Sequence, residues 1–143
     1  FAESSFAKQI AMIEAKQINP IVKVGNLKSL RTFSDVRDAV VAYYKLLTAN
    51  PIAGEYYNIG GNHTCTVGEM LNFLLSISKV KNIKIQESKD RLRPIDADNQ
   101  IPNINKFQKH TGWEPEISFE KTMKDLLNYW RIKISKGENY LVR

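Results

Sequence analysis

The chain has 143 residues, of which 43% are hydrophobic and 25% charged, a balance typical of a globular protein that can bury a core. Its formal net charge of +6 comes from scattered lysines rather than a basic stripe with aromatic residues, which argues against a nucleic-acid partner and suits an anionic small ligand. The longest apolar run, 39–44, is too short to span a bilayer and the start of the sequence lacks a signal-peptide pattern, so a cytoplasmic protein without a membrane partner is predicted.

A helix is predicted near the start of the chain, with Ser4 or Ser5 as its N-cap and Asn19–Pro20 as its end. Alternating apolar residues in 22–24 then predict a half-buried strand, and Gly25–Asn26 predicts a turn after it. The residues of the first helix that would face the core are Phe6, Ile10 and Ile13.

A second helix is predicted after residue 34. The Ser34 hydroxyl would accept a hydrogen bond from the first turn, and Asp35 would lie where the positive end of the helix dipole favours a carboxylate. Apolar residues recur at helical spacing, so one face of this helix is predicted to belong to the core. That face consists of Val36, Ala39, Val40, Tyr43 and Leu47.

Residues 55–60 are predicted to form a strand that ends at Gly60–Gly61. Thr66 and Glu69 have the spacing of a capping box, in which each residue bonds a free backbone N–H near the other. This pair predicts a third helix. Its core face would carry Met70, Leu71, Leu74, Leu75 and Ile77.

The last third of the chain predicts a strand, a loop and two helices. A short strand at 83–85 leads into 90–96, where Pro94 favours a loop over a helix. Asn103 is predicted to cap a helix that ends at Thr111 and is closed by Gly112. A last helix begins at Ser118, with a core face made of Phe119, Met123, Leu126, Leu127 and Trp130.

These alternating elements predict an α/β fold in a single unit, residues 1–143. Two clusters of strands are expected, one formed by 22–24, the piece near Phe33 and 83–85, and the other containing 56–59. Because the sequence begins at Phe1 and enters a helical pattern at once, we expect a fragment of a longer chain.

Several segments together resemble one family of enzymes. Val24-Gly-Asn-Leu27, followed by Arg31-Thr-Phe-Ser-Asp-Val-Arg-Asp38, is similar to a segment of the extended short-chain dehydrogenases/reductases that act on GDP-sugars. These are the GDP-mannose 4,6-dehydratases and the GDP-4-keto-6-deoxy-mannose reductases. Arg91-Leu-Arg-Pro-Ile-Asp96 resembles their Arg-Pro-x-Asp/Glu loop, and Thr111-Gly-Trp-Glu-Pro115 resembles their Thr-Gly-Trp-x-Pro motif.

This resemblance implies that the chain is the carboxyl-terminal substrate-binding lobe, with the last strand and helix of the Rossmann-type sheet. In the family, the strand matching 56–59 lies at the edge of that sheet. The resemblance also implies that NADP or NAD is bound mainly by a missing N-terminal Rossmann half, and that the full-length parent is a homo-oligomer.

The candidate substrate-binding residues are Arg31, Arg93, Asp96 and Asn26. Guanidinium groups bind phosphate oxygens through paired, charge-assisted hydrogen bonds, so two arginines suit the pyrophosphate of a sugar nucleotide. A carboxylate such as Asp96 accepts hydrogen bonds from ribose hydroxyls. In the family the arginine matching Arg31 faces the nucleotide end of the substrate.

Two positions depart from the family pattern. Thr32 stands where the family usually has an aspartate, which would leave Arg31 without that ion pair. Ser4 and Ser5 stand where the dehydratases commonly carry a basic pair that helps to hold the substrate. The serines, with the Arg31–Asp38 and Arg91–Pro94 segments, are closer to the reductases.

No catalytic, cofactor-binding or metal-binding residue is assigned. Tyr129 and Lys133 have the Tyr-x-x-x-Lys spacing, but they lie in the terminal helix and are interpreted as a solvated face. No glycine-rich loop opens a helix after a strand, so cofactor binding is expected outside this chain. His63 and Cys65 are too few for a zinc site, and the single cysteine cannot form an internal disulfide.

The sequence therefore predicts the GDP-sugar-binding part of a GDP-mannose 4,6-dehydratase that forms GDP-4-keto-6-deoxy-mannose, with no activity of its own. Three alternatives stay open. In the first, the parent is a GDP-4-keto-6-deoxy-mannose reductase of the GDP-rhamnose-forming type. In the second, the parent is an NAD(P)-dependent epimerase or dehydratase for another nucleotide sugar. In the third, the chain is a stand-alone binding module.

Overall fold

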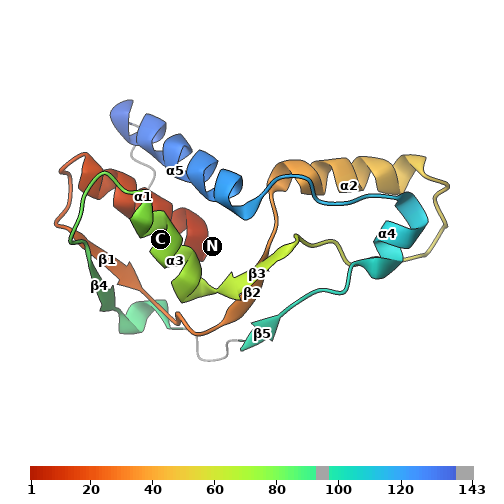
Figure 1. Ribbon diagram of the computed structural model, residues 1–143, viewed down its shortest axis with the longest axis horizontal. Helices are drawn as coiled ribbons and strands as arrows, with labels where there is room; N and C mark the ends of the chain where they lie inside the picture. The colour runs from red at the N-terminus through yellow and green to blue at the C-terminus, as the bar shows by residue number, and fades with distance from the viewer. Residues whose placement is uncertain (93–96, 138–143) are drawn as a thin grey trace.

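The computed structural model describes residues 1–92 and 97–137, and within these the predicted α/β class is confirmed. The chain is elongated, with α1, α3, β1 and β4 at one end, α2 and α4 at the other, and β2, β3 and β5 between them (Figure 1). The helices are α1 (Ala2–Glu14), α2 (Val36–Thr48), α3 (Val67–Ser76), α4 (Asn105–Thr111) and α5 (Phe119–Ser135), with a 3-10 turn η1 (Lys89–Arg91). The strands are β1 (Ile21–Val24), β2 (Leu30–Phe33), β3 (His63–Thr66), β4 (Lys84–Glu87) and β5 (Asn99–Gln100).

The strands form two small sheets. β1 pairs in parallel with β4, which agrees with the predicted placement of 22–24 and 83–85 in one cluster. β2 does not join them: it lies between β3, antiparallel, and β5, parallel. The predicted grouping of Phe33 with 22–24 is therefore wrong, because 63–66 extends as a strand and supplies β2 with a partner.

The larger core lies between α1, α3, α5 and β1. Among its buried side chains, Ile10, Leu71 and Leu127 are fully enclosed, so the predicted core faces of these three helices are confirmed. The side chain of Gln9 in α1 also closes the free edge of β1, accepting from Lys23 N at 2.8 Å and donating to Lys23 O at 3.1 Å. A buried amide thus replaces a missing strand partner.

Local end signals decide where most helices begin and end. Thr66 and Glu69 form the predicted capping box, Ser118 caps α5, and Gly112 closes α4 in the left-handed conformation at φ 63°. The predicted caps of the first two helices are wrong. Ser4 and Ser5 lie within α1, where their hydroxyls accept hydrogen bonds from Trp130 and Arg91. Asp35 rather than Ser34 caps α2.

Removing the capping box should weaken α3 measurably. Thr66→Ala is expected to lower the free energy of unfolding by about 1 kcal/mol, because the Glu69 N–H loses its side-chain acceptor. Urea denaturation followed by circular dichroism measures the change, and Thr48→Ala, at the exposed end of α2, is the control. An unchanged midpoint for Thr66→Ala would contradict this account of α3.

Residues 55–60 form no strand, so that prediction is wrong for the described chain. A strand needs a hydrogen-bonded neighbour, and no described strand pairs with this segment. Instead the segment is attached to α4. Lys106 Nζ contacts Glu55 Oε1 at 2.6 Å, and the Tyr57 hydroxyl shares a hydrogen bond with His110 Nδ1.

The predicted core face of α2 is also wrong. Val36 and Val40 are exposed, whereas Asp38 and Ala42 on the other side of the helix are buried. Ala42 packs in a second, smaller core with Phe107 and Trp113. The spacing of apolar residues correctly predicted a helix with an apolar stripe. The side of α2 that is buried in this chain is, however, the opposite one.

Candidate functional site

Arg31 lies in the middle of β2 and lines an open groove of about 560 Å³. Its Nη1 donates to Leu30 O at 2.9 Å and is 3.5 Å from Asp98 O. These two carbonyls orient the guanidinium between β2 and the turn that precedes β5. Besides Arg31, the groove is lined by Thr32, Asn99, Gln100, Ile101 and Pro102.

The strand register explains how this groove forms. Arg31 pairs with Gln100 of β5 and with Cys65 of β3, so it belongs to the central strand of the sheet. Paired residues of neighbouring strands point to the same face, which places Gln100 beside Arg31. Sequence reasoning missed β5, because two polar residues after a loop carry no strand pattern.

Thr32 makes a cross-strand hydrogen bond of 2.9 Å between its hydroxyl and that of Thr64. In place of the aspartate expected from the family pattern, backbone carbonyls hold Arg31. Thr32 itself is a short, neutral side chain and adds no charge to β2.

Asn26 has a structural part in the turn after β1. Its Oδ1 accepts from Lys28 N at 2.9 Å, and its Nδ2 donates to Ser29 Oγ at 2.8 Å. The preceding Gly25 is required by a close approach rather than by a positive φ, because an added Cβ would lie 2.3 Å from Arg91 O. The role of Asn26 in binding substrate stays a prediction.

Arg93 and Asp96, the other two candidates, lie outside the described residues. The chain on either side of them is placed. Before them, η1 packs on Gly25; after them, Asp98 O accepts from Leu30 N at 2.7 Å. Arg91 therefore lies beside the turn after β1, and Asp98 lies beside β2.

The two serines of α1 are engaged inside the protein. Trp130 Nε1 donates to Ser4 Oγ at 3.0 Å, and Arg91 Nη1 donates to Ser5 Oγ at 2.9 Å. Arg91 thereby joins η1 to α1. Sequence reasoning did not single out this arginine, since its partner lies 86 positions away in the chain.

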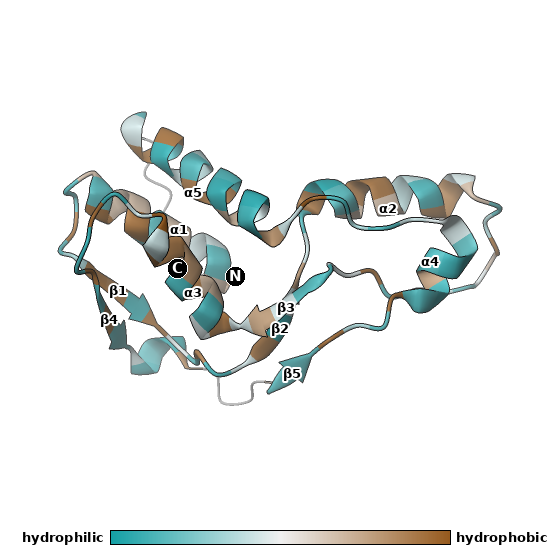
Figure 2. Cartoon of the chain, in the orientation of Figure 1, coloured by the Kyte–Doolittle hydropathy of each residue, from teal (hydrophilic) through white to brown (hydrophobic). Residues whose placement is uncertain are grey.

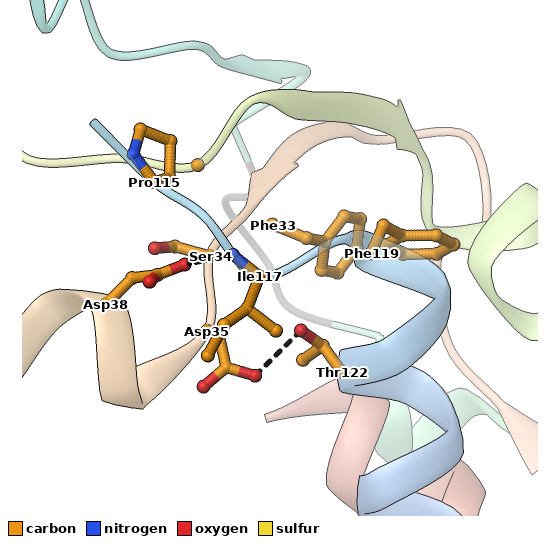
Figure 3. A pocket seen from close by; sticks show the side chains of 9 residues that line it. Phe33, Ser34, Asp35, Asp38, Pro115, Ile117, Phe119 and Thr122 are labelled. Atoms are coloured by element: carbon orange, nitrogen blue, oxygen red, sulfur yellow. Dashed lines mark hydrogen bonds between the residues drawn. The ribbon is translucent and has the colours of Figure 1, made fainter.

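A second polar cluster joins the starts of α2 and α5 (Figure 3). Asp35 accepts from Arg37 N at 2.9 Å, from Arg37 Nε at 2.8 Å and from the Thr122 hydroxyl at 2.7 Å. Hydrogen bonds from Arg37 hold the pKa of Asp35 well below its ordinary value, against the opposing effect of burial. Asp38, also buried, accepts from Ile117 N at 3.0 Å.

The cavity in this cluster has a volume of about 10 Å³, which is room for one water molecule at most. It therefore cannot admit a sugar nucleotide. Both carboxylates already accept hydrogen bonds from within the chain, so the Asp-Val-Arg-Asp stretch of the sequence is a structural joint. The groove at Arg31 is the better candidate for a ligand site.

The described residues do not fit a nicotinamide cofactor. No glycine-rich turn links a described strand to the start of a described helix. Gly61 has a packing role instead: an added Cβ at this position would lie 1.7 Å from Phe33 O, so a larger residue would not fit. Across residues 1–92 and 97–137, no group of three or more His, Cys, Asp or Glu could hold a metal ion.

Tyr129 and Lys133 lie together on α5, with the Lys133 ammonium 5.7 Å from the centre of the Tyr129 ring. The tyrosine is 50% exposed, and the groove at Arg31 is lined by other elements.

Within the part of the chain that the structure describes, no helix is both long and apolar enough to cross a membrane.

Comparison with known proteins identifies one family. The sequence model of the family described as GDP-mannose 4,6 dehydratase matches residues 1–126. GDP-6-deoxy-D-mannose reductase of Pseudomonas aeruginosa is 29% identical over 135 residues, which cover 94% of this chain and 43% of that protein.

Solved structures agree on the fold. The structure of RMD from Pseudomonas aeruginosa, complexed with NADPH, superposes with a TM-score of 0.83 at 26% identity, over 93% of this chain and 43% of that one. A putative epimerase from Burkholderia cenocepacia gives a TM-score of 0.74 at 27% identity, over 89% and 41%. The chain thus spans less than half the length of these relatives.

Proposed function

Because the chain belongs to the GDP-mannose 4,6-dehydratase family of extended short-chain dehydrogenases/reductases, we propose that it is the carboxyl-terminal, GDP-sugar-binding part of a larger NAD(P)-dependent enzyme. The observation that carries the proposal is that Arg31 lines an open groove large enough for a nucleoside diphosphate. Arg93 and Asp96 would complete the site as the sequence predicted, with Asn26 at its edge.

The role of this part is to orient the substrate. A guanidinium that holds the diphosphate far from the reacting sugar carbons supplies binding energy for alignment. NADP or NAD, bound by the N-terminal Rossmann half, would supply hydride transfer. The residues of this chain would fix the position of the nucleotide and leave the chemistry to the other half.

Dehydration of GDP-mannose to GDP-4-keto-6-deoxy-mannose is the first candidate reaction, as the family description suggests. Reduction of a GDP-4-keto-6-deoxy sugar is the second, favoured by the relative that bears the reductase name and by Ser4 and Ser5 in place of a basic pair. An assay of the full-length enzyme distinguishes them. A reductase consumes NADPH when given the keto sugar, whereas a dehydratase converts GDP-mannose without net consumption of cofactor.

The binding site is tested by replacing Arg31. Arg31→Ala is expected to weaken binding of GDP about 30-fold, which corresponds to about 2 kcal/mol for a hydrogen bond to a charged group. Titration of the 143-residue chain with GDP, followed by ¹H–¹⁵N NMR spectra, measures both strong and weak binding. UDP in a competing titration reports selectivity for the base.

Two variants make this test specific. Arg31→Lys keeps the charge but loses the planar fork, so it should recover only part of the affinity. Lys124→Ala removes one positive charge from an exposed position on α5 and should bind GDP as the unaltered chain does. Equal affinity of Arg31→Ala and the unaltered chain would refute the site.

A further inference from the structure

A glutamine lies beside Arg31 in the open groove. Gln100 belongs to β5, and its register partner on β2 is Arg31. Neighbouring strands lie about 4.8 Å apart and paired residues point to the same face, so the two side chains leave the sheet close together. Both residues line the groove of about 560 Å³. A ligand held by Arg31 therefore comes within reach of Gln100.

Contacts on either side of β5 fix the position of Gln100. Before the strand, Leu30 N donates to Asp98 O at 2.7 Å. After it, Pro102 packs closely on Gly60, where an added Cβ would lie 2.6 Å from Pro102 Cγ. β5 is an edge strand of its sheet (Figure 1), and these contacts hold it on β2. The backbone at Gln100 is thus held in place although the strand has only two residues.

The side chain of Gln100 is accessible to a ligand. It is exposed, and no hydrogen bond from within the described chain engages its amide. Figure 2 shows β5 as a hydrophilic strand. Among the described residues that line the groove, Arg31 alone carries a charge. Gln100 therefore adds a neutral polar group beside a positive one.

The two side chains suit different parts of a ligand. A guanidinium has only donors, so Arg31 can bind phosphate oxygens but cannot accept a hydrogen bond from a hydroxyl. A carboxamide has two N–H donors and a carbonyl acceptor, so Gln100 can both donate to a hydroxyl and accept from it. Sugar hydroxyls next to a diphosphate are the groups that match this pair.

We propose that Gln100 is a specificity-determining residue, which hydrogen-bonds a sugar hydroxyl next to the diphosphate that Arg31 binds. The groove would thereby prefer sugar esters of diphosphate over inorganic pyrophosphate. This inference rests on the proposed function, because it takes the groove to be the diphosphate site. It goes further by assigning recognition of the hydroxyl-bearing part of the ligand to one residue.

Gln100→Leu tests the proposal, because leucine is of similar size and lacks the amide. GDP-mannose, GDP and inorganic pyrophosphate are titrated separately into the 143-residue chain and followed by ¹H–¹⁵N NMR spectra, which also report that the fold is retained. The variant is expected to bind GDP-mannose about 5-fold more weakly, the scale of one neutral hydrogen bond, and pyrophosphate with unchanged affinity. An equal loss for GDP identifies the ribose as the bonded sugar, and a loss confined to GDP-mannose identifies the hexose.

The side-chain amide itself gives a direct readout. The Nε2 protons of Gln100 give a pair of signals in the same spectra, assigned by their absence in Gln100→Leu. These signals should shift on addition of GDP-mannose and stay in place with pyrophosphate. Gln86, exposed on β4 in the other sheet, provides the matched control. Gln86→Leu should bind all the ligands as the unaltered chain does.

The Arg31 and Gln100 experiments fail in different ways. Arg31→Ala should weaken binding of pyrophosphate as well as of the nucleotides, so an unchanged affinity for every ligand would refute the proposed function. If Arg31→Ala weakens binding while Gln100→Leu binds GDP-mannose and GDP as tightly as the unaltered chain, only the present inference is overturned. Equal losses for GDP-mannose and pyrophosphate in Gln100→Leu would also overturn it, because the residue would then act on the shape of the groove rather than on a hydroxyl.

Discussion

Glu14→Ala is expected to lower the free energy of unfolding by about 3–5 kcal/mol, the usual cost of removing one partner from a buried ion pair. The Glu14 side chain is only 7% exposed, and its carboxylate accepts from Arg131 Nε at 2.6 Å and Nη2 at 2.7 Å. It also accepts from Lys79 N at 2.8 Å. One carboxylate therefore joins the end of α1 to α5 and to the turn after α3.

Most of this loss of stability comes from the positive charge of Arg131, which remains after Glu14 is removed. Without Glu14, the Arg131 guanidinium, whose side chain is 23% exposed, stays in place with its charge uncompensated. Although burial alone raises the pKa of Glu14, the hydrogen bonds from Arg131 and Lys79 keep it below the ordinary value. The carboxylate is therefore ionised at neutral pH.

Urea denaturation at pH 7 measures this loss. Glu114→Ala is the matched control, because Glu114 is exposed in the segment between α4 and α5, and it should change stability by less than about 0.5 kcal/mol. A loss below about 1 kcal/mol for Glu14→Ala would place this pair among surface ion pairs and refute its role.

Sequence reasoning succeeded where neighbours in the chain decide the outcome. The Thr66–Glu69 capping box, the Ser118 cap and the left-handed Gly112 each depend on contacts within four residues. The core faces of α1, α3 and α5 were also predicted, because those helices pack on one another within this chain.

Sequence reasoning failed where the structure of a segment depends on a partner that is distant in the sequence. Residues 55–60 have the composition of a strand, but none of the described strands lies beside them. The stripe on α2 has the spacing of a core face, but nothing in the described chain covers it. In both cases the local pattern is real, and the contact that would complete it is not made by these residues.

The candidate site shows the same division. Arg31 was identified from its surrounding motif, and it lines the groove. The joint at Asp35 was not foreseen, since its hydrogen bond to Thr122 spans 87 positions. Only the Asp-x-Arg spacing of Asp35 and Arg37 could have indicated it.

Asp35→Ala is expected to lower the free energy of unfolding by about 3 kcal/mol, of which the helix cap alone accounts for about 1. The substitution removes the acceptor of Arg37 N, of the Arg37 side chain and of the Thr122 hydroxyl. Because the Arg37 side chain is 49% exposed, it can hydrate after the change, which keeps the loss below that of a fully enclosed pair. Thr122→Ala, which deletes only one of these bonds, should cost about 1 kcal/mol.

The pH dependence of this difference identifies the charge as its cause. Hydrogen bonds from Arg37 lower the pKa of Asp35 in the folded state, so the unfolded state takes up the proton first as the pH falls. The stabilisation is complete above the unfolded pKa of about 3.9 and is lost as the pH falls below it. The stability difference between the unaltered chain and Asp35→Ala, measured by urea denaturation, should therefore be constant from pH 7 to about pH 5 and shrink below about pH 4. A difference that stays constant down to about pH 3 would mean that the cap and packing, rather than the carboxylate charge, hold α2 to α5.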